Sequence, residues 1–380
     1  MSKKHQKHAK LTKPHLGQFG RNELAILGTP CGDIKRLTQD LTHGLAAQMS
    51  LAYIDADHKS PENEGITSPF LRNGGSFEYT DKIEFHQFNS ISGQTEFQRR
   101  SIFSEYDLIL VNGNHFVAQN QILVIDDRKS VEKKLDRLTD VVLILIQEGS
   151  HIPDFLPDAI DNFQNIPQLR FNDTQDIRSF IHDWHQSQIP AIKGLVLSGG
   201  KSERMQRDKT KIQYHGVYQR DHMLHLLSGI TTEAFYSVRP DQIEDFNGEN
   251  VIADRFFGLG PYGAVLSAMM EDPNAAWLVT AADQPFLNHR VLELLVEKRN
   301  PSKLATAFYN PETDFPEPLV TLWEPRAYPA MLNFLSLGFS CPRKVLINSD
   351  IELVKLDDAS VLDNVNTPEE YELALDRIKL

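Results

Sequence analysis

A loop with the residue types of a phosphate-binding site follows a short apolar run in the second half of the chain. Residues 194–198 predict a buried strand, and the loop after them contains GGKSERMQRDK. Gly199 and Gly200 have no side chains, so the backbone can approach a ligand closely and turn its N–H groups toward anionic oxygens. Arg204 and Lys209 add permanent positive charge. These residues predict a polyphosphate site, although their spacing does not match the P-loop pattern GxxxxGK[ST].

Two further segments of this half carry residues suited to a nucleotide and a metal ion. NVIADRFFGLGPYGAVLSAM places Asp254 before a glycine-rich loop, which opens a helix expected over residues 264–271. AAWLVTAADQPFL predicts a buried strand with Asp283 at its carboxyl end. Ligand sites of open α/β sheets gather at such ends, and carboxylate oxygens suit Mg²⁺. Alternatively, Asp283 serves only as a cap or turn residue before a helix from Asn288.

Taken in order, these segments resemble the molybdenum cofactor guanylyltransferases, a branch of the nucleotidyltransferases. LSGGKSERMQRDK resembles the family pattern LAGGxSxRMGxDK, with Ser198 in place of alanine and Gln206 in place of glycine. AADQPF resembles (C/A)DMPF, and NVNTPEEYELAL resembles NINTPEDL. The family usually has an asparagine near the end of the strand AFYSVR. Ser237, Val238 and Arg239 stand there instead, which leaves the identity of the base open.

The resemblance implies roles for residues at matching positions. The implied catalytic residues are Arg204, Lys209 and Asp283, and Asp283 is also the implied ligand of Mg²⁺, the one cofactor expected. The implied nucleotide-binding residues are Leu197, Ser198, Gly199, Gly200, Lys209, Asp254 and Asp283. Asn364 and Asn366 are implied to lie near the acceptor, and Glu317 of PEPLVTLWEP to face the acceptor side. Helix capping by Thr367 and Glu370 could by itself account for NVNTPEE.

The implied activity is that of a nucleotidyltransferase which moves GMP from GTP to molybdopterin and releases pyrophosphate. Positioning and charge neutralisation do most of the work in such a transfer, so no nucleophilic side chain is required. GTP and molybdopterin are the implied substrates, and molybdoenzymes or other cofactor-assembly proteins are candidate partners. Three alternatives stay open: cytidylyl transfer to the same pterin, nucleotidyl transfer to a sugar phosphate, and a non-catalytic scaffold of molybdenum cofactor assembly. The glycine pair that includes Gly199 favours guanine over cytosine.

The first half predicts a separate α/β domain. The apolar runs ELAILG, SLAYIDAD, IEFHQF, YDLILVNG, QILVID and DVVLILI alternate with helical stretches, which indicates a parallel sheet with crossover helices. The loop GTPCGDIKRL occupies the position of a phosphate loop, but Asp33 would repel phosphate and Lys35 lacks a following Ser or Thr. We therefore expect a P-loop-like domain with a degenerate phosphate loop.

The segment YDLILVNG loosely resembles the strand of the GTP-binding adaptor protein of molybdopterin-guanine dinucleotide synthesis, with Asn112 in place of its acid. The resemblance implies a degenerate adaptor domain that binds a partner or shapes an assembly rather than hydrolysing GTP. An unrelated doubly wound domain is the alternative.

Composition limits the remaining possibilities. The expected organisation is a basic, flexible tail over residues 1–21, a P-loop-like domain over 22–188, and a Rossmann-like nucleotidyltransferase with a mostly parallel sheet over 191–380. Without the six basic residues of the tail, 33 basic residues face 52 acidic ones, so the body would repel nucleic acid. Only two cysteines and no long apolar stretch are present, which favours a cytoplasmic protein without a membrane partner.

Overall fold

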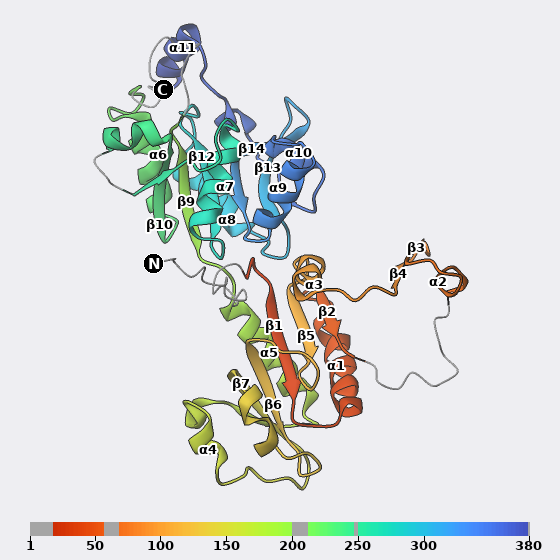
Figure 1. Ribbon diagram of the computed structural model, residues 1–380. Coiled ribbons are helices and arrows are strands. Elements are labelled where there is room, and N and C mark those ends of the chain that lie inside the picture. The colour runs from red at the N-terminus through yellow and green to blue at the C-terminus, as the bar shows by residue number, and fades with distance from the viewer. Residues whose placement is uncertain (1–17, 57–67, 200–211, 247–249, 379–380) are drawn as a thin grey trace, which may run out of the picture. The chain divides into compact units, whose positions relative to one another are not determined.

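The computed structural model describes residues 18–56, 68–199, 212–246 and 250–378 (Figure 1). It divides the chain into two compact units, of which one is Arg21–Ser187 and the other contains Gln188–Leu380 together with residues 18–20. Each unit has helices packed on its own mostly parallel sheet, which confirms the expected α/β fold class. None of the described helices is long and apolar enough to span a membrane.

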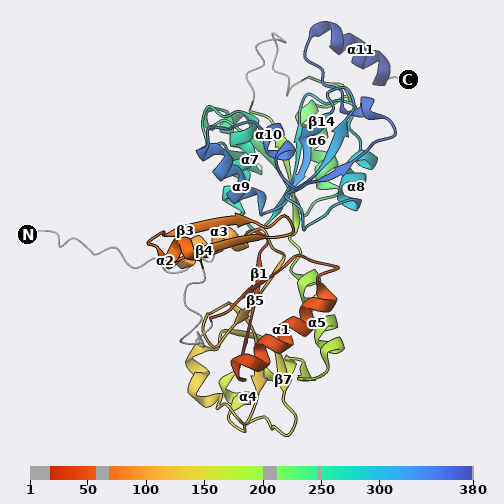
Figure 2. The ribbon, with the colours of Figure 1, turned by 90° about the vertical axis from the view of Figure 1, so that its right-hand side faces the viewer.

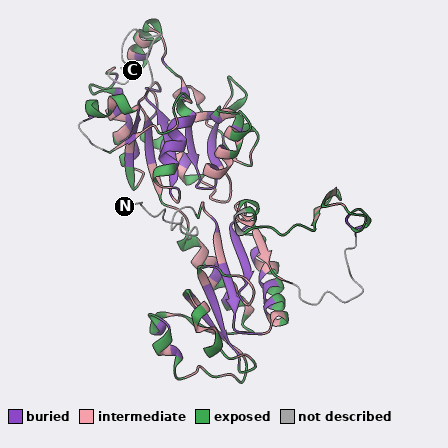
Figure 3. Ribbon diagram, viewed as in Figure 1, coloured by how far each residue is buried: buried purple, intermediate pink, exposed green. Residues whose placement is uncertain are grey.

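The first unit is built on a six-stranded sheet whose strand order is β2-β5-β1-β6-β7-β8. Its strands are β1 (Asn22–Leu27), β2 (Leu51–Ile54), β5 (Leu108–Asn112), β6 (Asn120–Ile125), β7 (Asp140–Ile146) and β8 (Gln168–Arg170). All five pairings are parallel. Nearly every residue of the central strands β5 and β6 is buried, as a sheet covered by helices on both sides requires (Figure 3).

Helices cover the two faces of this sheet. The described helices are α1 (Cys31–Leu45), α2 (Pro69–Arg72), α3 (Glu96–Phe103), α4 (Leu156–Ala159) and α5 (Thr174–Ser187), with short 3₁₀ turns at Glu132–Arg137 and Phe163–Asn165. The apolar sides of α1 and α5 pack together on one face, and α4 and the 3₁₀ turn at Phe163 pack on the other. The carboxyl ends of β1, β5 and β6 therefore meet at one edge of the sheet.

The sequence pattern places IEFHQF in the parallel sheet, and this prediction is wrong. The segment forms β4 (His86–Ser90), which pairs with β3 (Phe77–Asp81) as a separate antiparallel hairpin. Apolar and polar residues alternate along both strands, so that Phe88 packs against Phe77 and Tyr79 at ring-centroid distances of 6.3 and 5.2 Å. A central parallel strand would instead need apolar residues on both faces.

The basic segment ends earlier than expected. Arg21 is buried, and its Nε lies 3.1 Å from a carboxylate oxygen of Glu23, so this residue belongs to the first unit. The backbone N–H of Gln18 donates to Oδ1 of Asn274 at 2.8 Å, and the ring of Phe19 lies 5.9 Å from that of Tyr328. Residues 18–20 thus pack on the second unit, whereas residues 1–17 lie outside the described residues.

The second unit is built on a seven-stranded sheet whose order is β11-β10-β9-β12-β14-β13-β15. Its strands are β9 (Ile192–Leu197), β10 (Glu233–Val238), β11 (Val251–Ala253), β12 (Ala276–Ala281), β13 (Ala305–Asn310), β14 (Phe315–Trp323) and β15 (Glu352–Val354). Strands β9 to β12 are mutually parallel, and β14 runs antiparallel to β12 and β13. Strand β9 thus lies between two parallel neighbours, β10 and β12.

Two groups of helices enclose this sheet (Figure 2). The described helices are α6 (Gln219–Ser228), α7 (Pro261–Glu271), α8 (His289–Glu297), α9 (Ala327–Ser336), α10 (Pro342–Ile347) and α11 (Pro368–Ile378), with 3₁₀ turns at Pro240–Phe246 and Ala359–Leu362. Helices α6 and α8 share one core cluster with the sheet, and α7, α9 and α10 share the other. Because the chain leaves β9 through α6 and returns to β12 through α7, the carboxyl end of β9 is a topological switch point, where ligands of open sheets bind.

Candidate active site

Four parallel strands bring the described residues that were predicted to bind nucleotide to one edge of the second sheet. Strands β9, β10, β11 and β12 are parallel, so their carboxyl ends lie along the same edge. Gly199, Arg239, Asp254 and Asp283 come directly after these ends. Three of the four, Gly199, Asp254 and Asp283, are among the residues that the sequence pattern singles out.

The start of the signature loop is tied to the neighbouring strand. The Ser198 N–H donates to the Ser237 carbonyl at 2.9 Å, and Nη1 of Arg239 donates to the Gly199 carbonyl at 3.1 Å. A Cβ at Gly199 would lie 3.2 Å from the backbone nitrogen of Arg239, so only glycine fits there without a shift. Leu197 ends β9 in register with Ser237. Gly200, Arg204 and Lys209 lie outside the described residues.

Asp254 is half-buried and held by the strand beside it. The Ser237 hydroxyl donates to Oδ1 of Asp254 at 3.0 Å, and the Asp254 N–H donates to the Val238 carbonyl at 2.8 Å. Burial raises the pKa of Asp254, while the Ser237 hydrogen bond and the Arg239 charge act in the opposite direction. Ser237, one of the three residues at the place where the family usually has asparagine, is therefore hydrogen-bonded to Asp254.

The glycine-rich loop after Asp254 packs tightly against the first turn of α7. Gly258 and Gly260 have φ values of 75° and 55°, which favour glycine. A Cβ on Gly263 would lie 2.2 Å from the Phe256 carbonyl oxygen. The loop can therefore lie across the helix start only because this position has no side chain.

Asp283 follows β12 on a short segment that is fixed from two directions. Its carbonyl accepts from the Val365 N–H at 2.9 Å, and the Pro285 carbonyl lies 2.9 Å from Nε2 of His215. The interpretation of Asp283 as the cap of the following helix is wrong, because Oδ1 of Asn288 accepts from the Val291 N–H at 3.1 Å and caps α8. Asn288, and not Asp283, therefore caps α8, and Asp283 lies in the turn that follows β12.

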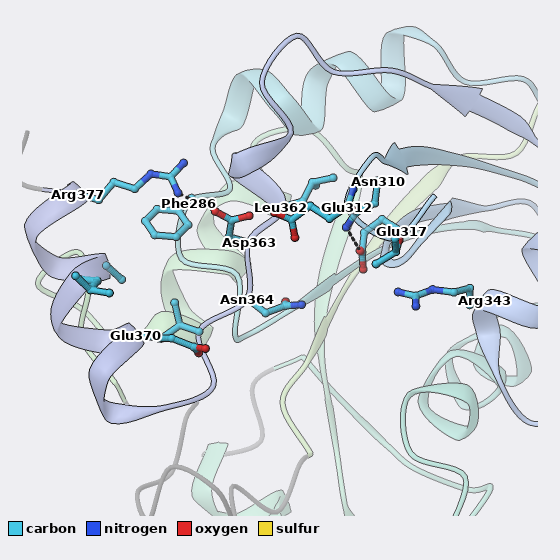
Figure 4. Close-up of a pocket in the computed structure, with 14 residues that line it drawn as sticks. Phe286, Asn310, Glu312, Glu317, Arg343, Leu362, Asp363, Asn364, Glu370 and Arg377 are labelled. Atoms are coloured by element: carbon cyan, nitrogen blue, oxygen red, sulfur yellow. Dashed lines mark hydrogen bonds and ion pairs between the residues drawn. The ribbon is translucent and has the colours of Figure 1, made fainter. Parts of the chain in front are cut away.

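A cavity of about 490 Å³ lies beside β13 and β14, which follow β12 in the sheet on the side opposite to β9, β10 and β11. Figure 4 shows the side chains that line it. Strands β13 and β14 and helix α10 supply one part of its lining, and residues 362–365 with α11 supply the rest. Asn364 lines it, as does Glu317. Because Val365 is bonded to the Asp283 carbonyl, the segment that carries Asn364 lies beside the end of β12.

Capping accounts for the neighbouring part of this segment. The Glu370 N–H donates to the Thr367 hydroxyl at 3.2 Å, and a Glu370 carboxylate oxygen accepts from the N–H groups of Thr367 and Asn366 at 3.1 and 2.6 Å. This capping box fixes the start of α11. Asn364 lines the cavity, whereas Asn366 is not among the lining residues. The two asparagines that the sequence pattern groups together are thus separated by the structure.

Several lining residues carry no sequence pattern that could identify them. Asn310 ends β13, and Arg343 lies in the first turn of α10. Arg377 in α11 lies 3.9 Å from the ring centroid of Phe286 and 2.9 Å from a carboxylate oxygen of Asp363. Only the tertiary fold brings these residues to the cavity. A basic residue in the last turn of a helix is too common a feature to have singled out Arg377.

The donor set at this edge fits a metal ion that retains water. Among the described residues, no group of three or more His, Cys, Asp or Glu side chains could hold a metal ion. Asp283 offers a single carboxylate. One carboxylate together with substrate phosphates and waters is a typical ligand set for Mg²⁺, and it does not suit a metal that needs an all-protein site.

In the first unit, ion pairs fill the position of the phosphate loop. The Nη2 atom of Arg128 lies 2.8 Å from a carboxylate oxygen of Asp33 and 2.7 Å from a carboxylate oxygen of Asp126. The Thr29 hydroxyl donates to Asp126 at 2.5 Å. The Arg128 guanidinium lowers the pKa of Asp126 to about 2, so this carboxylate stays charged. The carboxylates of Asp33 and Asp126, paired with Arg128, therefore lie at the position of the phosphate loop. A phosphate at this position would need backbone amides and an ammonium group instead.

Comparison with known proteins agrees with the arrangement of the second unit. Residues 194–350 match the family described as MobA-like NTP transferase domain. A molybdenum cofactor biosynthesis bifunctional protein of Synechocystis sp. is 34% identical over 49% of this chain and 54% of its own length, so the chain spans about half of that relative. A probable molybdenum cofactor guanylyltransferase of Carboxydothermus hydrogenoformans is 28% identical over 47% of this chain and 93% of its own length.

Among solved structures, molybdopterin-guanine dinucleotide biosynthesis protein A of Archaeoglobus fulgidus aligns with 49% of this chain and 98% of its own, at 22% identity and a TM-score of 0.43. The family match covers β9 to α10 and includes the strand ends that carry Gly199, Asp254 and Asp283. The family match confirms the resemblance expected for the second half: residues 194–350 match the family described as MobA-like NTP transferase domain.

Proposed function

We propose that the second unit transfers GMP from GTP to the terminal phosphate of molybdopterin and releases pyrophosphate. The position of Asp283 is the observation that supports this most strongly. In the sheet, β9, β10 and β11 lie on one side of β12, and the cavity-lining strands β14 and β13 lie on the other. Asp283, at the end of β12, therefore lies between the strand ends that carry Gly199 and Asp254 and the cavity, where a group acting on both substrates would lie.

Different residues of the chain would bind the nucleoside, the triphosphate and the metal ion. Ser198, Gly199 and Asp254 would hold the nucleoside part, and Arg204 and Lys209 of the signature loop would hold the triphosphate. Asp283 would bind Mg²⁺, which supplies charge neutralisation at the phosphates. An acceptor phosphate oxygen forms a bond to the α-phosphorus while the bond from that phosphorus to the pyrophosphate oxygen breaks, and pyrophosphate leaves with the electron pair.

For the first unit we propose a role in binding a partner or shaping an assembly. The contacts of Arg128 with Asp33 and Asp126 support it, because they hold two carboxylates at the position of the phosphate loop, where they would repel a triphosphate. Molybdoenzymes and other proteins of cofactor assembly are the candidate partners.

Pyrophosphate release in the presence of molybdopterin and Mg²⁺ tests the proposed function. Each of the four ribonucleoside triphosphates is supplied separately to the wild type, to Asp283→Asn and to Asp314→Asn. Asp314 is an exposed aspartate of the same unit, in the turn between β13 and β14, and serves as the matched control.

We expect release with GTP, a loss of about 100-fold or more in Asp283→Asn, and no change in Asp314→Asn. Release with CTP in place of GTP would contradict guanylyl transfer. Equal rates in Asp283→Asn and the wild type would remove Asp283 from the mechanism.

A further inference from the structure

The cavity beside Asp283 has an excess of acidic groups. Its charged lining side chains are four carboxylates, Glu312, Glu317, Asp363 and Glu370, and two guanidinium groups, Arg343 and Arg377. Arg377 is already engaged with Asp363, at 2.9 Å. Such a lining disfavours phosphate and favours a ligand that presents N–H donors.

Glu317 is the most deeply buried of these acids. It lies on β14, only 3% of its surface is exposed, and among the described residues it forms no ion pair. Its carboxylate accepts two long hydrogen bonds, from Nδ2 of Asn310 at 3.4 Å and from the Leu319 N–H at 3.3 Å. A carboxylate can accept about four hydrogen bonds, so its two oxygens have room for ligand donors.

The groups around Glu317 do not fully offset the cost of burying its charge. Burial raises the pKa of Glu317 and the charge of Asp283 acts in the same direction, while the Leu319 N–H, Asn310 and Arg343 act against them. A buried acid with weak protein partners is costly unless a ligand completes its hydrogen bonds. Figure 4 shows Glu317 beside Asn310 at the cavity, with Arg343 and Asn364 nearby.

We propose that Glu317 recognises the acceptor by accepting hydrogen bonds from the ring N3–H and the 2-amino group of its pterin. This inference rests on the proposed function, which makes the acceptor a pterin. The two donors are adjacent on the aminopyrimidinone edge and match the two oxygens of a carboxylate, as a bidentate pair requires. The acid-rich lining then directs the acceptor's phosphate away from this end of the cavity and toward Asp283.

Binding of two simple ring compounds tests the inference without any transfer reaction. Pterin carries the 2-amino group, and lumazine has the same two fused rings with a 2-oxo group in its place and a proton on N1. Fluorescence titration measures the Kd of each compound for the full-length wild type, for Glu317→Gln and for Glu312→Gln. Glu312 is an exposed acid on the same cavity, so its variant changes the same charge without the proposed contact.

We expect the wild type to bind pterin at least about 10-fold more tightly than lumazine, because lumazine turns an oxygen toward the carboxylate. Glu317→Gln should lose this preference, since its amide offers one donor and one acceptor, and Glu312→Gln should keep it. Equal binding of the two compounds by the wild type, or an unchanged preference in Glu317→Gln, would overturn the inference. The wild-type comparison decides even if the variant does not fold.

Steady-state kinetics separates this inference from the proposed function. In Glu317→Gln we expect kcat/KM for molybdopterin to fall about 10- to 100-fold while KM for GTP stays unchanged. A wild type that prefers pterin but transfers no GMP would overturn the proposed function and leave the inference standing. A wild type that transfers GMP, with the same molybdopterin KM in Glu317→Gln, would overturn the inference and leave the function standing.

Discussion

At the residue scale, the second unit keeps two acids in positions that do not favour their charge. Burial raises the pKa of both Asp254 and Glu317, and neither carboxylate has a close cationic partner among the described ion pairs. Asp254 has a serine hydroxyl at 3.0 Å, and Glu317 has two long hydrogen bonds. Buried acids with few partners are typical of ligand sites, because a bound ligand can supply the hydrogen bonds or the positive charge that the protein does not provide.

Replacing Glu317 by Gln should stabilise the unliganded protein at neutral pH. The folded-state pKa of Glu317 lies above its unfolded value, so its favourable contribution is complete below the unfolded value and is lost as pH rises through the folded one. The variant should therefore melt at a higher temperature than the wild type at pH 7, by about 2–4 °C for each kcal/mol recovered, and the gap should close in acid. Thermal unfolding followed by circular dichroism at several pH values measures this. A variant less stable than the wild type at pH 7 would contradict it.

At the element scale, the loop between β11 and α7 depends on one missing side chain. Gly263 lies in the first turn of α7, where an added Cβ would meet the Phe256 carbonyl oxygen. The loop begins just after Asp254, so a shift of the loop would also move this carboxylate. The position of the nucleotide side thus depends on the close approach of a loop and a helix.

Gly263→Ala should destabilise the second unit by about 1–3 kcal/mol and raise the KM for GTP, because the loop must move away from the helix. Gly32→Ala is the matched control, since a Cβ at Gly32 in α1 would meet nothing within 4 Å. We expect the control to be as stable as the wild type or more so. Denaturant unfolding and GTP kinetics report both effects, and equal behaviour of the two variants would contradict the prediction.

How far the sequence predicts the elements depends on how local the determining contacts are. Strands β9 and β12 are largely apolar runs with Gly199 and Asp283 just beyond them, so both the strands and the edge they share could be predicted. The prediction for IEFHQF failed because an alternation of apolar and polar residues also fits a strand of an exposed hairpin. Which of the two forms depends on the partner strand, and here that partner is β3. Asn310 and Arg343 could not be identified, because β13 and α10 reach the cavity only through the tertiary fold.

At the scale of the whole molecule, the two units differ in the residues that lie at the carboxyl ends of their parallel strands. In the first unit, Arg128 pairs with two carboxylates at the position of the phosphate loop. In the second, the corresponding edge carries Gly199 and Asp283, and residues 194–350 match the family described as MobA-like NTP transferase domain. We therefore expect GTP to bind in one unit of the chain.

Hydrogen exchange of the full-length chain locates that binding. With GTP and Mg²⁺, peptides from β9, β12 and the loop before α7 should gain protection. Peptides covering β1 and α1 should not change, because the ion pairs at Asp33 would have to be broken first. Protection of the β1–α1 loop by GTP would contradict this expectation and restore a nucleotide role to the first unit.

Transfer of label from GTP to the acceptor tests the central claim most directly. The full-length protein is incubated with Mg²⁺, molybdopterin and GTP labelled at the α-phosphate. The products are separated and their masses are measured by mass spectrometry. The proposed function predicts that the label appears in one new species with the mass of molybdopterin joined to GMP, in step with pyrophosphate, and that Asp283→Asn forms about 100-fold less of it. Label that stays in GTP, or appears only in free GMP, would contradict guanylyl transfer.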